Sequence, residues 1–218
     1  MGSVIDWNDV QPQKPARSGG GGGGMSDKFL KLSQGEYQVR PVGKPYQFYA
    51  YYVADPKNPK KFYRAVTADP LNCVIRTNHN LEPKTRYAVN VIDRADGKLK
   101  IMEGPVSVFD KIKEWARVSK QDPGKNGGAD FSIKVVVPAN GDRKRTEYNT
   151  TPIVQTPFTA EEQEMLKKEG LHKLEEIYQS TPQNEIEAKL FPEMAQASAP
   201  AQQSTGSAPA SAANDLGF

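Results

Sequence analysis

Apolar and polar residues alternate with a period of two in several stretches of the chain, and this alternation limits the fold more than any other feature. The stretches cover residues 37–41, 46–53, 62–66, 87–91, 98–102, 131–137 and 145–150. Ala95-Asp96-Gly97 and Asn140-Gly141, which separate two pairs of these stretches, are turn sequences. Because side chains alternate between the two faces of a strand, the pattern predicts a mainly β protein built from hairpins.

One segment in this region has helical spacing instead. Val108, Ile112 and Trp115 recur at intervals of three or four between residues 106 and 118. Several strands, then one helix, then a closing hairpin match the OB fold. We therefore predict a five-stranded Greek-key barrel with one inserted helix, within a core that spans residues 28–158.

Both ends of the chain differ in composition from that core. Residues 1–18 form a polar peptide, and residues 19–27 include six consecutive glycines, which is typical of a flexible linker. We expect the peptide to be tethered to the core without packing on it. Residues 195–218 are rich in Ala, Ser, Gln and Pro, and this composition predicts a disordered tail.

Residues 159–194 form an acidic segment with helical patterns. Thr159 and Glu162 have the spacing of a capping box, so we expect a helix to begin there, and Gly170 interrupts it. The helices of this segment either pack on the barrel or present a surface to a partner. Packing is the simpler interpretation, because their apolar stripes need a cover.

Charge and aromatic residues are divided in a similar way. Residues 28–148 hold 23 Lys and Arg against 13 Asp and Glu, whereas residues 149–218 hold 4 against 10. Of the 19 aromatic residues, 14 lie in residues 28–148. Rings and cations in one segment are typical of proteins that bind single-stranded nucleic acid, because bases stack on the rings while a positive groove follows the phosphates.

The densest aromatic run, KPYQFYAYYV at residues 44–53, supplies the candidate stacking residues. On a strand, Tyr46, Phe48 and Tyr52 share one face, and Tyr49 and Tyr51 share the other. Since Phe48 has no polar tip, we assign its face to the core, and Tyr49 and Tyr51 to the nucleic acid. The alternative is that all five rings pack, two of them against an insertion at residues 54–83.

Outward or loop positions on the same segments supply the other candidate nucleic-acid-binding residues. These are Arg40, Lys61, Tyr63, Arg64, Arg76, Arg86 and Lys134. The most basic turn contains Arg143, Lys144 and Arg145 and joins the last two strands, where an OB fold commonly grips a strand. A single cation of this kind is typical of any solvated surface, so the prediction depends on the whole set.

We expect no metal, no cofactor and no enzyme active site. Cys73 is the one cysteine, and with His79 and His172 it gives too few soft ligands for a structural zinc. The sequence has no phosphate-binding loop and no nucleophile-elbow motif. The single cysteine, the absence of a signal-peptide pattern and the absence of an apolar run of about 18 residues predict a cytoplasmic protein without membrane spans.

Several of these stretches together resemble a known family. FLKLSQGEYQVRPVG, PKTRYAVNVIDRADGKLKIMEG, a helix, and GGADFSIKVVV ending in TEYNTTPI are similar to the core of single-stranded DNA-binding proteins of tailed phages, of the gene thirty-two type. The resemblance covers about residues 28–192. Better-known members hold zinc in a Cys/His cluster, and the corresponding stretch here offers Cys73 and His79, which implies a variant without zinc.

The resemblance implies an OB-fold protein of the infected host cell that coats single strands during DNA replication, recombination and repair. It also implies self-association along DNA and recruitment of phage replication proteins through the C-terminal region. We therefore predict sequence-independent binding of single-stranded DNA. The alternatives are an RNA-binding module of similar fold, which matched DNA and RNA oligonucleotides would distinguish, and a structural virion or scaffolding protein, which would not bind oligonucleotides.

Overall fold

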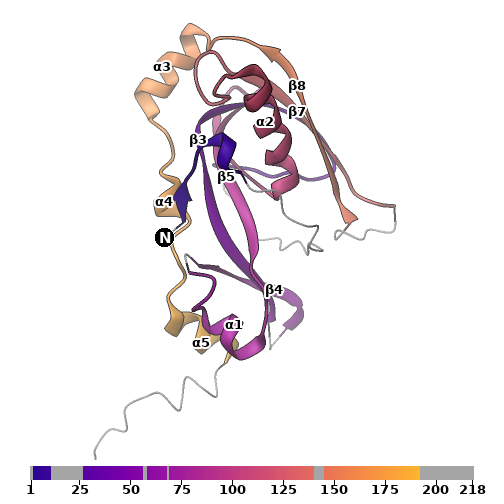
Figure 1. Ribbon diagram of the computed structural model, residues 1–218, viewed down its shortest axis with the longest axis vertical. Helices are drawn as coiled ribbons and strands as arrows, with labels where there is room; N and C mark the ends of the chain where they lie inside the picture. Colours follow the sequence, from indigo (N-terminus) through magenta and orange to yellow (C-terminus); the bar gives the residue numbers. More distant parts are fainter. Residues whose placement is uncertain (1, 11–26, 56–57, 68, 140–144, 192–218) are drawn as a thin grey trace, which may run out of the picture.

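The computed structural model describes residues 2–10, 27–55, 58–67, 69–139 and 145–191 (Figure 1). Residues 19–24, Arg143, Lys144 and the tail at 195–218 lie outside this part of the chain, so what the sequence predicts for them stays a prediction. No helix in the described ranges is long and apolar enough to cross a membrane.

The strands form one mixed sheet around the long strand β3, Gly35–Asp55. One side of β3 pairs with β5, Lys84–Asp93. The other side pairs successively with β7 (Ala129–Val136), β1 (Ser3–Val4) and β4 (Asn58–Thr67). Further out, β6 (Leu99–Gly104) pairs with β5, β2 (Phe29–Leu30) with β6, and β8 (Glu147–Gln155) with β7. All these pairs are antiparallel except that of β2 with β6.

The alternating stretches at residues 37–41 and 46–53 are parts of this one strand. β3 continues through an irregularity between Val42 and Tyr46, where its pairing with β5 shifts register. Gly43 in this interval has a φ of 74°, which a residue without a Cβ adopts easily. The strand can therefore bend there without ending, and its second half extends beyond the core.

Helix α2, Val106–Ser119, covers one face of the sheet, where the sequence predicts a helix. Phe109 and Ile112 of α2 are fully buried with Tyr87 of β5 and Phe131 of β7. The rings of Tyr87 and Phe109 lie with their centroids 5.3 Å apart. This face of the sheet and α2 together form the main hydrophobic core.

The strands that carry this core lie in the order β6-β5-β3-β7-β8, and α2 connects β6 to β7. The prediction of a mainly β fold with a helix before the last hairpin is confirmed. Among the described residues no ladder joins β6 to β8, so the sheet is open where the predicted barrel would close. The sheet also exceeds five strands, because the insertion at 54–83 adds β4 and helix α1 (Val74–His79) and the N-terminal part adds β1 and β2.

Residues 2–10 of the N-terminal peptide pack on the core, so the expectation that the peptide would merely be tethered is wrong for this part of it. β1 lies beside Tyr46 and Gln47 of β3, between the stretches of β3 that pair with β7 and β4. The 3-10 turn η1, Trp7–Asp9, follows, and Trp7 is 1% exposed. Its ring stacks on Phe109 with centroids 6.2 Å apart. The buried side chains of Trp7 and Val10 supply the apolar area that docks the peptide.

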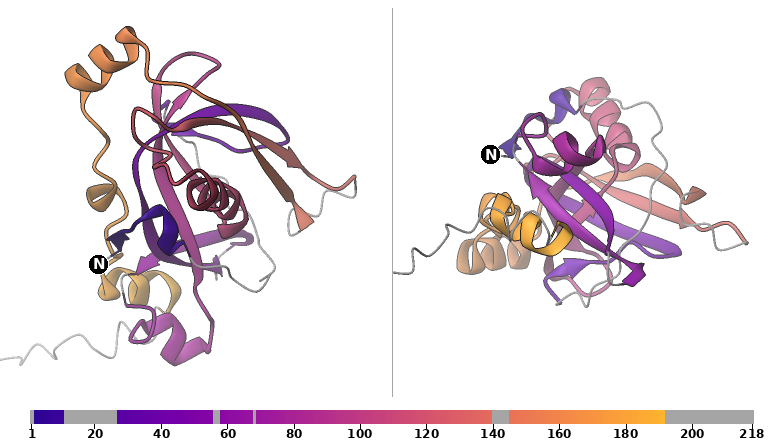
Figure 2. Two further views of the ribbon diagram at one scale, coloured as in Figure 1. Left: turned by 45° about the horizontal axis from the view of Figure 1, so that its top comes forward. Right: turned by 90° about the horizontal axis from the view of Figure 1, so that it is seen from below.

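The C-terminal segment, residues 159–191, runs along the side of the sheet opposite α2, and we call it the strap (Figure 2). Its helices are α3 (Ala160–Glu169), α4 (Leu174–Ile177) and α5 (Gln183–Leu190). The predicted capping box is confirmed: the Thr159 hydroxyl accepts a hydrogen bond from the Glu162 amide, and the Glu162 carboxylate accepts one from the Thr159 amide.

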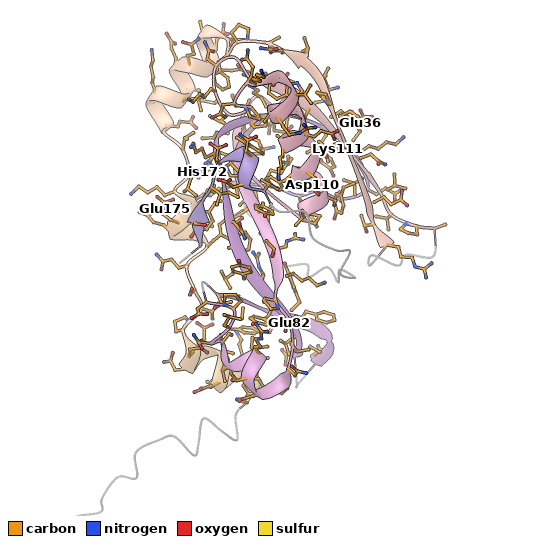
Figure 3. All side chains as sticks on the ribbon, in the orientation of Figure 1. Glu36, Glu82, Asp110, Lys111, His172 and Glu175 are labelled. Carbon is orange, nitrogen blue, oxygen red and sulfur yellow. The ribbon has the colours of Figure 1, made fainter. Side chains whose placement is uncertain are left out.

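The strap is fixed to the sheet by polar and apolar contacts. Asn90 of β5 donates a hydrogen bond to the His172 carbonyl at 3.0 Å and accepts one from the His172 amide at 3.1 Å. Figure 3 labels His172 and Glu175 on this side of the molecule. Leu174 and Tyr178 are buried on the sheet. The interpretation that these helices pack on the core is confirmed.

Candidate nucleic-acid interface

The second half of β3 and strand β4 form a two-stranded arm, residues 49–55 and 58–67, which carries most of the aromatic run (Figure 1). Because side chains alternate along each strand, the arm has two faces. Tyr51 lies opposite Ala65, and Tyr52 lies opposite Arg64. Residues that are paired across strands share a face, so Tyr51 and Tyr52 belong to different faces.

Tyr51 lies on a face that other parts of the chain cover. It is 2% exposed and packs with Ile75 of α1 and Ile186 of α5. Its hydroxyl donates a hydrogen bond to the Pro70 carbonyl at 2.9 Å, and burial raises the pKa of Tyr51 to about 12. The prediction that Tyr51 points outward is wrong. Tyr51 packs against the insertion, as the alternative supposes for two of the five rings.

Tyr63 and Tyr49 share this covered face with Tyr51, and both are half-buried. The Tyr63 hydroxyl donates to the Glu185 carboxylate at 3.2 Å, and the Lys189 ammonium lies 4.7 Å from the ring centroid. Burial raises the pKa of Tyr63 to about 12. The Tyr49 hydroxyl accepts a hydrogen bond from the Gln47 amide at 3.3 Å. Tyr63 therefore holds α5 in place, while part of Tyr49 remains accessible.

The other face of the arm and the adjacent part of β5 are rich in rings and cations, and we call them the open face. Its members are Tyr52, Phe62, Arg64, Lys84 and Arg86, which the register of β3 with β4 and β5 places on one side. Phe62 is 48% exposed, and Tyr52 is half-buried. The Lys84 ammonium lies 5.7 Å from the centroid of the Tyr52 ring. Rings with accessible faces and cations are thus brought together on one surface.

Glu103 of β6 fixes the two arginines of the open face. Its carboxylate pairs with Arg64 at 2.9 Å and with Arg86 at 3.3 Å. Burial lowers the pKa of the Arg64 guanidinium, but the charge of Glu103 raises it, and the net shift is upward. The side chain of Arg64 is still 32% exposed. Three cations, Arg64, Lys84 and Arg86, thus share this surface, and Glu103 pairs with two of them.

The strap closes the inner end of the open face. The ring of Tyr178 stacks on Phe48 with centroids 4.3 Å apart and planes inclined by 19°. The Tyr178 hydroxyl donates to Glu103 at 3.3 Å, and the Arg64 guanidinium lies 5.3 Å from the Phe48 centroid. Phe48 and Tyr46 are buried beneath this contact. Accessible rings therefore begin at Tyr52, further out along the arm.

The start of β8 carries Tyr148, which is half-buried against the main core. Burial raises the pKa of the Tyr148 phenol, and the charge of Arg86 lowers it. Arg145 is exposed just before β8. The basic turn that the sequence predicts therefore ends directly before β8.

Arg40 is a structural residue, so the prediction that it points outward is wrong. Its side chain is 0% exposed, and its guanidinium donates to the carbonyls of Lys125 and Asn126 at 2.9 and 3.2 Å. The same group lies 4.7 Å from the centroid of the Phe158 ring. Burial lowers the pKa of Arg40, and Asp130 raises it. Arg40 thus fixes the loop that follows α2 to the sheet.

The remaining predicted cations are spread over different surfaces. Arg76 of α1 pairs with Glu82 at 3.0 Å, at the end of the arm where Figure 3 labels Glu82. Lys61 is exposed beside Phe62, and Lys134 is exposed on β7. Of the predicted site residues, the structure therefore brings Arg64 and Arg86 together, places Lys61 nearby, and leaves Arg76 and Lys134 apart from them.

Sequence reasoning missed Tyr52, Phe62 and Lys84. The alternation assigns Tyr52 to the core because it shares a face with Phe48, and that face is indeed buried, but only at its inner end. The cations Arg64, Lys84 and Arg86 lie on the same face as Tyr52, but this can be seen only when the register of the strands is known. The register itself could not be read from the pattern.

A metal site finds no support in the ranges that the structure describes. No group of three or more His, Cys, Asp or Glu side chains there could hold a metal ion. Cys73 is buried, and His79 stacks on Phe191 with centroids 4.2 Å apart. No protein-family model and no curated protein matches the sequence.

Proposed function

We propose that the protein binds single-stranded DNA without base specificity and coats it. The observation that carries this proposal is the open face, where Tyr52 and Phe62 lie among Arg64, Lys84 and Arg86. Each base stacked on a ring contributes about 1–3 kcal/mol, and every base has a π-face, so such binding tolerates any sequence. Cations between the rings are placed to neutralise phosphates.

A single strand fits this surface better than a duplex does. Stacking on Tyr52 or Phe62 requires a base whose flat face is free, and the bases of a duplex are already stacked on one another. The open face also lies on an arm that projects from the sheet, so a strand could lie along it. Phosphate contacts with Lys84 and Arg86 would then add a salt-dependent contribution to the affinity.

The order of the core strands supports an OB-type interpretation of the fold. The five strands β3, β5, β6, β7 and β8 follow one another along the chain, and α2 lies between the third and the fourth. In this series the arm belongs to the connection between the first two strands, and the basic turn connects the last two. In OB folds these loops flank the oligonucleotide. With the resemblance at the sequence level, this favours a non-catalytic role in phage DNA replication, recombination and repair, with partners recruited through the C-terminal region.

The proposal is tested by titrating labelled single-stranded DNA, the matched duplex and the matched RNA with the protein over a range of salt concentrations. We expect the single strand to bind more tightly than the duplex, with an affinity that falls as salt rises. Tyr52→Ala should weaken binding, and Tyr52→Phe is the matched control that keeps the ring. Preference for RNA would indicate the RNA-binding module, and a lack of binding to all three would favour a scaffolding role.

A further inference from the structure

The turn η1 and the end of α2 border a pocket of about 480 Å³, which we call the α2 pocket. One wall is the last turn of α2, the second is the loop that follows this helix, and the third is η1 with Asp6 before it. η1 lies beside α2, where Trp7 stacks on Phe109 (Figure 2). Trp7 and Ala116, both buried, belong to the lining. None of the described residues that line the pocket belongs to the open face.

The backbone after α2 folds back to make this pocket. Lys120 ends the helix with a φ of 56°, in the left-handed region, and turns the chain away from the helix. The Gly124 amide donates a hydrogen bond to the Asp122 carboxylate at 2.9 Å, and the Gly43 amide donates one to the Gly124 carbonyl at 2.9 Å. A Cβ on Gly124 would lie 1.8 Å from the Gly43 carbonyl oxygen, so this close approach requires glycine. The loop is therefore fixed to β3, and the second wall of the pocket is preformed.

Cations outnumber carboxylates in the lining of the α2 pocket. Arg117 and Lys120 come from the end of the helix and Lys125 from the loop, and all three side chains are exposed. In the described ranges these three side chains make no ion pair and no hydrogen bond. The two carboxylates of the lining are already engaged: one pairs with Lys44 at 3.2 Å, and the other accepts the hydrogen bond from the Gly124 amide. The charge that remains to be balanced in this pocket is therefore positive.

The end of α2 explains only part of this arrangement. The carbonyl end of a helix favours nearby positive charge, which accounts for Arg117 and Lys120 but not for Lys125 of the loop. Asn8 and Gln121 add amide donors and acceptors to the same lining. Arg binds phosphate through parallel hydrogen bonds and Lys binds it as a point charge. The volume of the pocket lies within the range of about 300–1,000 Å³ that is typical of small-molecule sites.

We propose that the α2 pocket binds one nucleotide. Arg117, Lys120 and Lys125 hold its phosphate, and the amides of Asn8 and Gln121 contact its sugar or base. The nucleotide is either free or the phosphorylated end of a single strand, and both offer the same phosphate ester. This inference does not depend on DNA binding at the open face and goes beyond the proposed function.

The test is a calorimetric titration of the whole protein with thymidine monophosphate. We expect one molecule to bind per chain. Thymidine, which lacks the phosphate, and inorganic phosphate, which lacks the sugar and base, should each bind weaker by roughly tenfold or more. The double variant Lys120→Gln/Lys125→Gln should weaken binding of thymidine monophosphate by a similar factor. Lys134→Gln, which removes an exposed cation of β7, is the matched control and should bind normally.

Tyr52→Ala separates this pocket from the open face. Binding of thymidine monophosphate that persists in Tyr52→Ala but is lost in Lys120→Gln/Lys125→Gln supports the inference. The reverse pattern, equal binding of inorganic phosphate, or no binding at about 10 mM, where a site of millimolar Kd would be mostly occupied, overturns it. Arg117→Gln replaces the double variant if the latter melts below the unmodified chain.

Oligothymidylate binding, measured in parallel, keeps this inference apart from the proposed function. Loss of thymidine monophosphate binding with oligothymidylate binding intact overturns the inference about the α2 pocket alone. The source of the nucleotide follows from 5′-phosphorylated and 5′-hydroxyl oligothymidylates. A tighter 5′-phosphorylated strand whose advantage disappears in Lys120→Gln/Lys125→Gln identifies the strand end, and equal affinities of the two strands, with thymidine monophosphate bound, identify the free nucleotide.

Discussion

The two faces of the arm are made by the same strands and have opposite environments. On the covered face, Tyr51 and Tyr63 are held by α1, α5 and the Glu185 carboxylate. On the open face, Tyr52 and Phe62 keep exposed surface and lie among cations. An alternating strand separates its rings into two sets, but the segments that pack against it decide which set is buried. The aromatic run is dense because it supplies rings to both faces of the arm.

The two faces differ in burial because the strap crosses the edge of the arm and packs on each face at a different place. Tyr178 packs on Phe48 on one face, and Ile186 packs with Tyr51 on the other. Between them, the Thr181 amide donates to the Val66 carbonyl at 2.8 Å, and the Val66 amide donates to the Thr181 hydroxyl at 3.0 Å. The strap therefore covers the face of Tyr51 near the arm's end and the other face only at the base of the arm.

The largest expected effect is on stability and belongs to the covered face. Tyr51→Ala removes a fully buried ring and should lower the free energy of unfolding by about 3–5 kcal/mol. Denaturant unfolding measures this change. The folded fraction should bind single-stranded DNA almost as the unmodified protein does. A Tyr51→Ala protein of normal stability that binds DNA poorly would instead make the covered face the binding surface.

Glu103→Gln should affect stability and binding in opposite directions. The change removes the charge shared by Arg64, Arg86 and the Tyr178 hydroxyl, and hydrogen bonds to charged groups contribute about 1.5–3 kcal/mol each. We therefore expect a loss of roughly that size in the free energy of unfolding. DNA affinity at low salt should rise, because the open face gains net positive charge. A fall in affinity, with folding intact, would show that the arrangement of the two arginines matters more than their charge.

Tyr52→Ala should lower the affinity for single-stranded DNA by about 1–3 kcal/mol, because the stacking surface is lost. Tyr52→Phe should bind nearly as well as the unmodified protein, since the ring remains. Melting should change little in either variant compared with Tyr51→Ala. Equal losses for Ala and Phe would mean that the hydroxyl, and not the ring, is what the ligand requires.

The smallest expected effect concerns salt. Lys84→Ala should flatten the plot of log K against log salt by about 0.7, the change expected when the protein neutralises one phosphate fewer on a single strand. Lys111→Ala on α2 is the matched control, because Lys111 pairs with Glu114 on a helix outside the open face. Filter-binding titrations at several salt concentrations measure both slopes. Equal slopes for the two variants would place Lys84 outside the path of the phosphates.

Much of the fold could be predicted because alternation and helical spacing are local properties of the sequence. The helix α2 and the capping box at Thr159 follow from such local signals. The burial of Tyr51, Arg40 and Trp7 could not be predicted, because each depends on segments distant in the sequence that cover it. Arg40 shows this most clearly: its position in the alternation is shared with outward residues, and the loop carbonyls that bind it lie 85 and 86 residues further along the chain.

The most direct test of the central claim is to find where a bound strand touches the protein. Oligothymidylate bound to the unmodified protein is crosslinked by ultraviolet light, and the modified residues are identified by mass spectrometry. The account predicts crosslinks at Tyr52 and Phe62, with none at Tyr51 or Tyr63, which α1 and α5 cover. Crosslinks confined to α2 or to the outer side of β7, with the open face unmodified, would contradict it.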